Sequence, residues 1–515
     1  MADSGEDLKT LLSSASLVIV GGLISSGGTL VERIVIGRLL SPSKYGEVAV
    51  AIAVLTFATT FALVGFSQGI PRYLSRYDES ADRRGVWLGG LVFTGAISLV
   101  LAGAIFLKAD LIAAALFDRP EAVALVRVFA LAVPFVVGQQ VVVNTIRGFE
   151  NTLYRMYVQD LLYPIGRIGL IVGLLLLGMD VLAAGYAYLV AAALSFAFGH
   201  YLLRRLMPLR GPYRTHVREM LVFSAPLIVS TMMSLLLTKT DTVMVSYFKS
   251  STQAGLYDAS YSIAAGMLVV LSAFGFMFLP IASRLDADGE HEELNRIYRT
   301  TTKWVYIVTF PAFLTFLLFP EDVMRITFGE GYEAAAAALP ILAVGFFLNA
   351  AVGRNREALS AVGYTKFILV ANLSGFVFNF LLNLVLIPMY GFIGAAITSA
   401  LSVVIVHGIV NGVLKVYFDI SPISPANVRT FALLPVCLLP PAALFARYVS
   451  LSALTLLPFL VAVGLAAIGV VAAGGGLQSE DRVVIEVVEE RIGVRIPLVR
   501  RYLPTPTGSQ STGGD

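Results

Sequence analysis

The 515-residue sequence is poor in the residues from which soluble enzymes build their sites. Its single cysteine, Cys437, excludes an internal disulfide and a cysteine metal cluster. The four histidines, His200, His216, His291 and His407, are scattered and form no catalytic constellation. Only 14% of the residues are charged, whereas a soluble domain carries about a quarter. We therefore expect no enzyme, no cofactor, no metal site and no nucleic-acid partner.

Hydrophobic residues dominate instead and make up 57% of the chain. Apolar runs of about 20 residues, the length that crosses the hydrocarbon core of a bilayer, recur from end to end. We expect an all-α polytopic membrane protein with about 14 transmembrane helices. The predicted spans are 14–38, 45–69, 86–107, 122–146, 156–178, 181–203, 220–247, 255–280, 303–320, 335–353, 367–388, 391–417, 428–447 and 451–473.

A pattern near the N-terminus recurs 209 positions later. SSGGTLVERIVIGRLLSPSKYG at 25–46 matches SLLLTKTDTVMVSYFKSSTQAG at 234–255, and Gly46 returns as Gly255. A constant offset over such a stretch indicates two homologous halves. It predicts two pseudo-symmetric six-helix lobes around a central cavity, followed by a C-terminal helix pair.

The repeat sets the expected domain boundaries. Spans 1–6 form an N-terminal lobe over residues 1–208, and spans 7–12 form a C-terminal lobe over residues 209–418. Residues 419–477 have no counterpart and are expected to form an appended helix hairpin, and residues 478–515 a cytoplasmic tail.

Each half carries a polar stripe within apolar surroundings. Ser25, Thr29 and Glu32 are spaced by four and then three residues, which places them on one face of a helix, and the repeated stripe ends in Asp241. An ionisable residue inside a bilayer costs about 2.5–3.5 kcal/mol and normally faces a bundle interior or a hydrated pathway. We expect the two stripes to line a central path. The alternative is that they join the halves through hydrogen bonds.

Several cations also fall within or beside the predicted spans. Arg167 lies too deep in span 5 to reach water easily, so it is either a cavity cation or the structural partner of Asp160. Arg33 and Lys239 lie close in sequence to the two acids and could pair with them across the bundle.

Other arginines and lysines concentrate in the even-numbered connections, and the connection at 204–218 is the most basic. The positive-inside rule then places those connections and both termini in the cytoplasm. Arg354 and Arg356, after span 10, occupy the position that Arg147 holds in the first half.

The repeat, the spans and the phrases GRLLSPSKYGEVAVAIAV, VGFSQGIPRYLSRY and TDTVMVSYFKSSTQAGLYDASYSIA together resemble the polysaccharide transporters of the multidrug/oligosaccharidyl-lipid/polysaccharide superfamily. The resemblance implies a flippase for polyprenyl- or dolichyl-phosphate-linked oligosaccharides, working by alternating access in polysaccharide or glycoprotein glycan assembly. It implies a V of two lobes in the cytoplasmic membrane, contact with membrane lipids, and glycosyltransferases or a glycan polymerase or ligase as partners.

In related flippases, basic cavity residues hold the pyrophosphate and the sugars. The matching candidates are Arg33, Arg167, Lys239, Arg354 and Arg356.

The energy source must be an ion gradient, the membrane potential or substrate consumption, because the sequence contains no G-x-x-x-x-G-K-[ST] loop for ATP. Glu32 and Asp241 are the candidates for proton or sodium coupling, and a fixed salt bridge is the alternative.

Two other classes compete. An ion-coupled multidrug or cation exporter of the same superfamily would share both lobes but favour acids and aromatic residues over arginines. A membrane-embedded glycan polymerase or ligase would normally carry a large extracytoplasmic loop, and the predicted outer loops are short.

Overall fold

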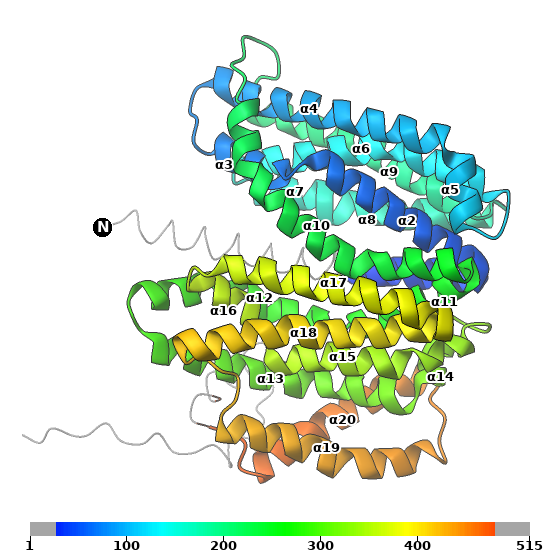
Figure 1. Cartoon of the computed structure of the whole chain (residues 1–515), viewed down its shortest axis with the longest axis vertical. Coiled ribbons are helices and arrows are strands. Elements are labelled where there is room, and N and C mark those ends of the chain that lie inside the picture. The colour runs from blue at the N-terminus through cyan, green and yellow to red at the C-terminus, as the bar shows by residue number, and fades with distance from the viewer. Residues whose placement is uncertain (1–26, 479–480, 482–515) are drawn as a thin grey trace, which may run out of the picture.

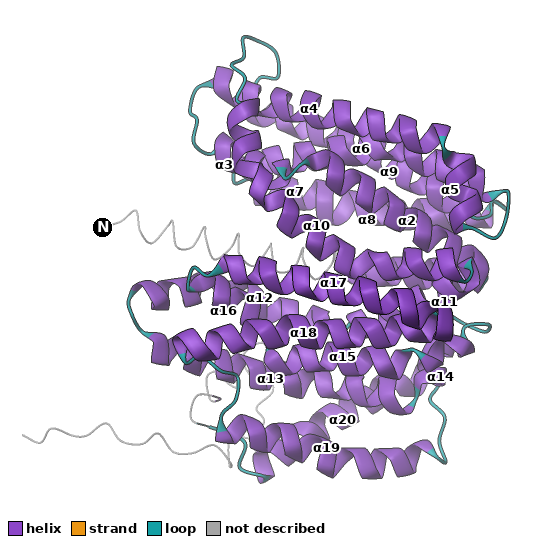
Figure 2. Ribbon diagram, in the orientation of Figure 1, coloured by secondary structure: helices purple, strands orange, loops and turns teal. Residues whose placement is uncertain are grey.

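The computed structural model describes residues 27–478 and Asp481, and these residues form helices, turns and loops without a strand (Figure 2). A helix over residues 27–39 comes first. The helices that follow are α2 (Pro42–Leu63), α3 (Phe66–Leu74), α4 (Ser80–Leu107), α5 (Ala109–Leu116), α6 (Ala122–Gly148), α7 (Thr152–Arg155), η1 (Met156–Leu162), α8 (Tyr163–Leu176), α9 (Leu182–Leu206), α10 (Val217–Phe248), α11 (Ser251–Ala265), α12 (Leu268–Ala287), α13 (His291–Leu318), α14 (Pro320–Thr327), η2 (Glu333–Ala337), α15 (Leu339–Val352), α16 (Asn355–Ala361), α17 (Thr365–Tyr390), α18 (Phe392–Phe418), α19 (Pro425–Ala446) and α20 (Ala453–Ala473).

Eleven helical segments in the described part of the chain are long and apolar enough to cross a membrane. The remaining three predicted spans differ for separate reasons. Most of 14–38 lies outside the described residues, 255–280 is divided between α11 and α12, and 335–353 becomes the 3-10 turn η2 followed by the short helix α15. The chain is thus an all-helical membrane protein, and the count of fourteen spans stays a prediction.

A break in the chain also divides the predicted span 45–69. Val64 and Gly65 have φ values of 48° and 72°, which end α2 and start α3 in a new direction. Val64 is β-branched and therefore seldom adopts a positive φ, so this break could not be predicted from the local sequence.

Two groups of helices are visible in Figure 1, one from α2 to α9 and one from α11 to α18. The long helix α10 joins them. Near its start, a β-carbon on Gly89 of α4 would meet Val217, and one on Gly69 of α3 would meet Ser224. Near its end, α10 packs on α11 and α17. The groups lie apart at the end that contains α3 and α12 and meet at the end that contains α5, α11 and α14.

The closed end is formed by two glycines that the sequence repeat relates to each other. A β-carbon on Gly46 of α2 would lie 1.8 Å from the carbonyl oxygen of Ser251, and one on Gly255 of α11 would lie 2.1 Å from the carbonyl oxygen of Pro42. The backbones of α2 and α11 therefore touch where neither residue has a side chain. Asp118 adds a hydrogen bond of 2.8 Å, accepted by its Oδ2 from the Ser251 amide.

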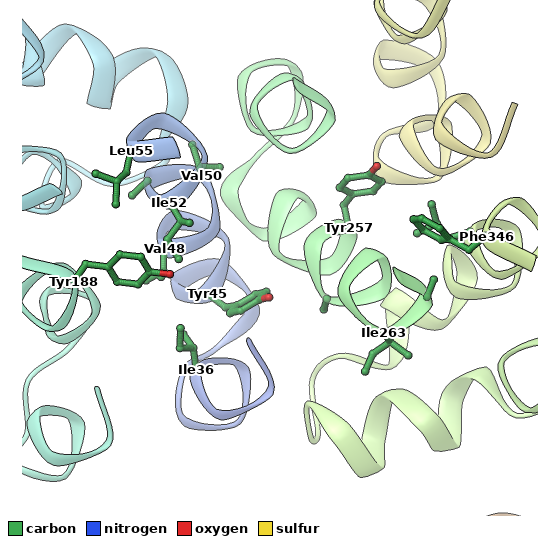
Figure 3. Packing of buried hydrophobic residues seen from close by; sticks show 14 of the residues in the cluster. Ile36, Tyr45, Val48, Val50, Ile52, Leu55, Tyr188, Tyr257, Ile263 and Phe346 are labelled. Carbon is green, nitrogen blue, oxygen red and sulfur yellow. The ribbon is translucent and has the colours of Figure 1, made fainter. Parts of the chain in front are cut away.

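Most buried apolar side chains form one large cluster that runs through both groups, and a smaller cluster lies within the second group. Figure 3 shows Tyr45 and Val48 on α2 and Tyr188 on the neighbouring α9, with Tyr257 and Phe346 on the other side of the contact. This continuous core keeps α2 and α11 in place around the buried polar residues that they carry.

A buried ion pair anchors the chain after the α19–α20 hairpin. Lys303 of α13 donates from Nζ to Oδ2 of Asp481 at 2.5 Å, and Trp304 donates from Nε1 to Oδ1 at 2.8 Å. The Lys303 and Asp481 side chains are completely buried. The hairpin packs on α13, and this pair fixes the segment that follows it to the same helix.

Candidate functional site

A cavity of about 340 Å³ lies between the helix over residues 27–39 and the helices α10, α11 and α12. Its polar lining includes Thr29 and Arg33 from the first of these, Lys239 from α10, and Asp258 and Tyr261 from α11. These helices come from both halves of the chain. The cavity thus joins two of the predicted cavity cations, Arg33 and Lys239, in one space.

Arg33 is buried and already has a partner. Its Nη1 lies 3.1 Å from Oδ2 of Asp258, and the same oxygen accepts a hydrogen bond of 2.6 Å from the Tyr45 hydroxyl. The pair links the two halves, but its acid is Asp258, which the sequence analysis did not select. An acid inside the apolar span 255–280 was the available signal.

Lys239 differs from Arg33, because it forms no ion pair or hydrogen bond within the described ranges. The expected pairing of Arg33 or Lys239 with Glu32 or Asp241 is not found. With the Arg33 charge balanced by Asp258, the ammonium group of Lys239 gives the cavity its uncompensated positive charge.

Glu32, on the helix over residues 27–39, forms a separate pair with Arg167 on α8 of the first helix group. The Glu32 side chain is 1% exposed, and one of its carboxylate oxygens accepts a hydrogen bond from Nη2 of Arg167. The guanidinium carbon of Arg167 lies 4.7 Å from the ring centroid of Tyr163 and 4.4 Å from that of Tyr188. Arg167 therefore pairs with Glu32 and not with Asp160. Neither Glu32 nor Arg167 is among the described residues that line the 340 Å³ cavity.

Asp241 is buried in the second helix group among neutral donors. Its carboxylate accepts hydrogen bonds from the Tyr257 hydroxyl at 2.7 Å, from Nδ2 of Asn383 at 2.6 Å and from the Ser399 hydroxyl. Asn383 also donates to Oδ1 of Asn379 at 3.0 Å, and its own Oδ1 has no hydrogen-bond partner among the described residues. No cation lies within ion-pair distance of Asp241 in that part of the chain.

The two predicted polar stripes therefore do not face each other along their whole length. Ser25 lies outside the described residues, and Thr29 lines the central cavity. The carboxylate of Glu32 instead contacts α8 of the first group, and that of Asp241 contacts α11 and α17 of the second.

Arg354 and Arg356 lie on the second group and differ in their surroundings. Arg354 is 3.3 Å from the carboxylate of Glu357. Arg356 lines a separate cavity of about 200 Å³ with Thr238 and His407, and it forms no ion pair with the rest of the described chain. The five predicted cations are thus distributed over three environments: the central cavity, the buried pair with Glu32, and the second group.

Comparison with known proteins agrees with this architecture. A family model described as "Polysaccharide biosynthesis protein" matches residues 11–286, and the MatE model matches residues 226–385. The lipopolysaccharide biosynthesis protein WzxC of Escherichia coli is 24% identical over 82% of this chain and 83% of its own length. The probable low-salt glycan biosynthesis flippase Agl15 of Haloferax volcanii is 26% identical over 44% of this chain, and the match spans 47% of that relative's length.

Among solved structures, the lipid II flippase MurJ in an inward closed conformation has a similar fold, with a TM-score of 0.71 at 12% identity. It covers 88% of this chain and 98% of its own. An inward-facing multidrug transporter of the MATE family has a TM-score of 0.62 at 15% identity, and covers 76% of this chain and 95% of its own. These two structures show the fold, and the family follows from the model that matches residues 11–286, which are more than half of the chain. The chain belongs to the polysaccharide biosynthesis protein family of the multidrug/oligosaccharidyl-lipid/polysaccharide flippase superfamily.

Proposed function

We propose that the chain is a flippase that moves polyprenyl- or dolichyl-phosphate-linked oligosaccharides across the cytoplasmic membrane, for polysaccharide or glycoprotein glycan assembly. The observation that carries the proposal is the cavity between helices of the two halves, into which Lys239 brings an uncompensated positive charge beside Arg33. A lipid-linked sugar keeps its tail in the bilayer, so only its phosphate and sugar head needs a polar lining. The names of WzxC and Agl15 support the same class of substrate.

The five cations contribute in different ways under this proposal. Lys239 meets the phosphate in the central cavity, where the charge of Arg33 is already balanced by Asp258, and Arg356 offers a further positive charge in the second group. A guanidinium can bind a phosphate through two hydrogen bonds, whereas the lysine ammonium acts as a point charge. Arg354 and Arg167 are balanced by Glu357 and Glu32, so they contribute less to the affinity for an anion.

The arrangement of the two helix groups supports alternating access. The groups meet at Gly46 and Gly255 and lie apart at the other end (Figure 1). With even-numbered connections and both termini in the cytoplasm, the end at which the groups lie apart would face the cytoplasm in this arrangement. The cycle would alternate it with one in which the Gly46–Gly255 contact opens.

Asp241 is the stronger candidate for coupling to a proton or a sodium ion. Its carboxylate is buried and its donors are neutral, so the charge it carries is not balanced by a neighbouring residue. Glu32 is the weaker candidate, because Arg167 already balances its charge. No step is assigned to ATP, since the sequence contains no phosphate-binding loop of that type.

The test begins with deletion of the gene. In the deletion strain, one then determines on which face of the cytoplasmic membrane the lipid-linked oligosaccharides lie. The proposal expects a completed glycan to accumulate on the cytoplasmic face, and expects Lys239→Ala to reproduce this defect at normal protein levels. Lys366→Ala is the matched control, because Lys366 is an exposed lysine outside the cavity. Normal export from the Lys239→Ala protein would contradict the role of this cation.

An ion-coupled multidrug exporter is the second candidate, and the match of residues 226–385 to the MatE model favours it. Susceptibility of the deletion strain to a panel of toxic cations separates the two. Normal glycan export together with new drug sensitivity would replace the flippase with the exporter. Glycosyltransferases and a glycan polymerase or ligase are the expected partners only if the glycan accumulates.

A further inference from the structure

A third cavity, here called the hollow, is lined by residues of α3. Figure 1 shows α3 at the end of the molecule where the two helix groups are apart. The hollow has a volume of about 600 Å³ and lies between α3, the last turn of α6 and the first half of α10. Its polar lining includes Gln68, Arg72, Ser75, Arg147 and Thr231. None of these residues belongs to the 340 Å³ cavity described above.

The two arginines of this hollow have no acidic or hydrogen-bonding partner among the described residues. Neither the Arg72 nor the Arg147 side chain forms a hydrogen bond or an ion pair anywhere in residues 27–478. The guanidinium carbon of Arg72 lies 4.0 Å from the ring centroid of Phe223, so the ring covers one face of the group. Contact through the face leaves the N–H groups at the edge available for a ligand.

Close packing holds the helices that carry these arginines together. Gly148, at the end of α6, lies so close to α3 that a β-carbon there would be 2.8 Å from Cβ of Leu74 and 3.1 Å from Cα of Pro71. Arg147 precedes this contact and Arg72 follows Pro71. The two cations are thus attached to helices fixed against each other, and a ligand need not bring them together.

The charge of the hollow is positive despite one acid. Glu150 also lines it, but its carboxylate is not within ion-pair distance of any described arginine or lysine. Two arginines and one glutamate leave a surplus positive charge. The hollow also has an apolar side, formed by Pro71, Phe223 and Leu227, and its two guanidinium groups are the part that suits an anionic head group.

We propose that this hollow binds a phosphate or pyrophosphate group at the cytoplasmic side of the membrane, through Arg72 and Arg147. Arginine forks match phosphate oxygens, and the cytoplasmic leaflet presents anionic head groups. The group can belong to a membrane phospholipid or to a lipid-linked pyrophosphate. The site goes beyond the proposed flippase function, because phospholipids carry the same chemistry whether or not the chain transports a glycan.

The test measures binding to the purified full-length chain in phosphatidylcholine nanodiscs. The probes are inorganic pyrophosphate, farnesyl pyrophosphate and phosphatidylglycerol included in the nanodisc, each read by calorimetry or thermal shift. The variant Arg72→Gln/Arg147→Gln removes both guanidinium groups. The matched control Arg204→Gln/Arg218→Gln removes the same charge from exposed arginines outside the hollow.

Binding of at least one probe should weaken about tenfold or more in the Arg72/Arg147 variant, because charge-assisted hydrogen bonds are lost, and stay unchanged in the control. Arg72→Lys/Arg147→Lys should retain part of the affinity. Competition by inorganic pyrophosphate indicates recognition of the phosphoryl group alone. If phosphatidylglycerol displaces farnesyl pyrophosphate, the natural ligand is a membrane phospholipid. If phosphatidylglycerol does not displace it, the natural ligand is a lipid-linked pyrophosphate. Equal affinity of the Gln variant and the wild type for all three probes would overturn the proposal.

Discussion

Alanine at Gly46 is expected to weaken the contact that closes one end of the molecule. The β-carbon would lie 1.8 Å from the carbonyl oxygen of Ser251, whereas real β-carbons essentially never come within 3.0 Å of another heavy atom. The obstacle is backbone, so no change of side-chain rotamer can relieve the clash. Gly46→Ala therefore requires α2 and α11 to move until the 1.8 Å separation reaches at least 3.0 Å.

The cost of this clash falls on one conformation. Adding a methyl group to a tightly packed contact typically costs about 1–3 kcal/mol. A penalty of this size changes a two-state equilibrium about 5- to 150-fold. Because the penalty exists only while α2 and α11 touch, it should disfavour the arrangement in which this end is closed. The equilibrium should shift toward the arrangement in which Gly46 and Gly255 are separated.

Spin-label distances test this shift directly. With Cys437 replaced by serine, labels at Glu121→Cys and Glu330→Cys report on the two groups near the closed end, where both native side chains are exposed. Gly46→Ala should add longer distances to the distribution. Gly103→Ala is the matched control, because a β-carbon at Gly103 meets no atom within 4 Å. An unchanged distribution in folded Gly46→Ala protein would refute the reasoning.

Three further outcomes follow from the buried charges. Lys303→Met should lower the free energy of unfolding, measured in detergent, by about 3–5 kcal/mol, because Asp481 is left buried without its partner. The double variant Lys303→Met/Asp481→Leu should recover much of this loss, because no unpaired charge remains. Arg167→Met should cause a similar loss, which Glu32→Gln in the same chain should reduce. Asp241→Asn should change unfolding much less but abolish the ion dependence of transport, and retained ion dependence would exclude Asp241 as the coupling residue.

The repeat in the sequence predicted more of the structure than composition alone could. Its offset pairs Gly46 with Gly255, and these two residues form the contact between α2 and α11. Hydrophobic length also located most helices to within a few residues, because the bilayer sets the length of each span. The break at Val64 was not predictable, because a positive φ in a β-branched residue is imposed by packing rather than by local preference.

The partners of the buried charges were harder to predict than the charges themselves. Asp258 is the acid that pairs with Arg33, but the residue that precedes it by 209 positions is Ala49, so the repeat gave no signal there. Asn383 lies 142 residues from Asp241 and appears in sequence as one polar residue in an apolar run. Such pairings depend on which helix faces which, and one sequence without its packing does not contain that information.

Glu32 and Asp241 occupy equivalent positions in the two halves, yet their surroundings give them different capacities. Arg167 balances Glu32, so loss of the negative charge would leave a buried guanidinium without its partner. Asp241 is surrounded by neutral donors that can turn or exchange partners, so its charge can be neutralised by a proton or a cation without leaving another charge exposed to the apolar interior. The repeat therefore places similar acids at equivalent positions, but one of them forms a fixed ion pair and the other has an adjustable set of partners. We infer that coupling to an ion, if the chain uses it, acts through the second helix group.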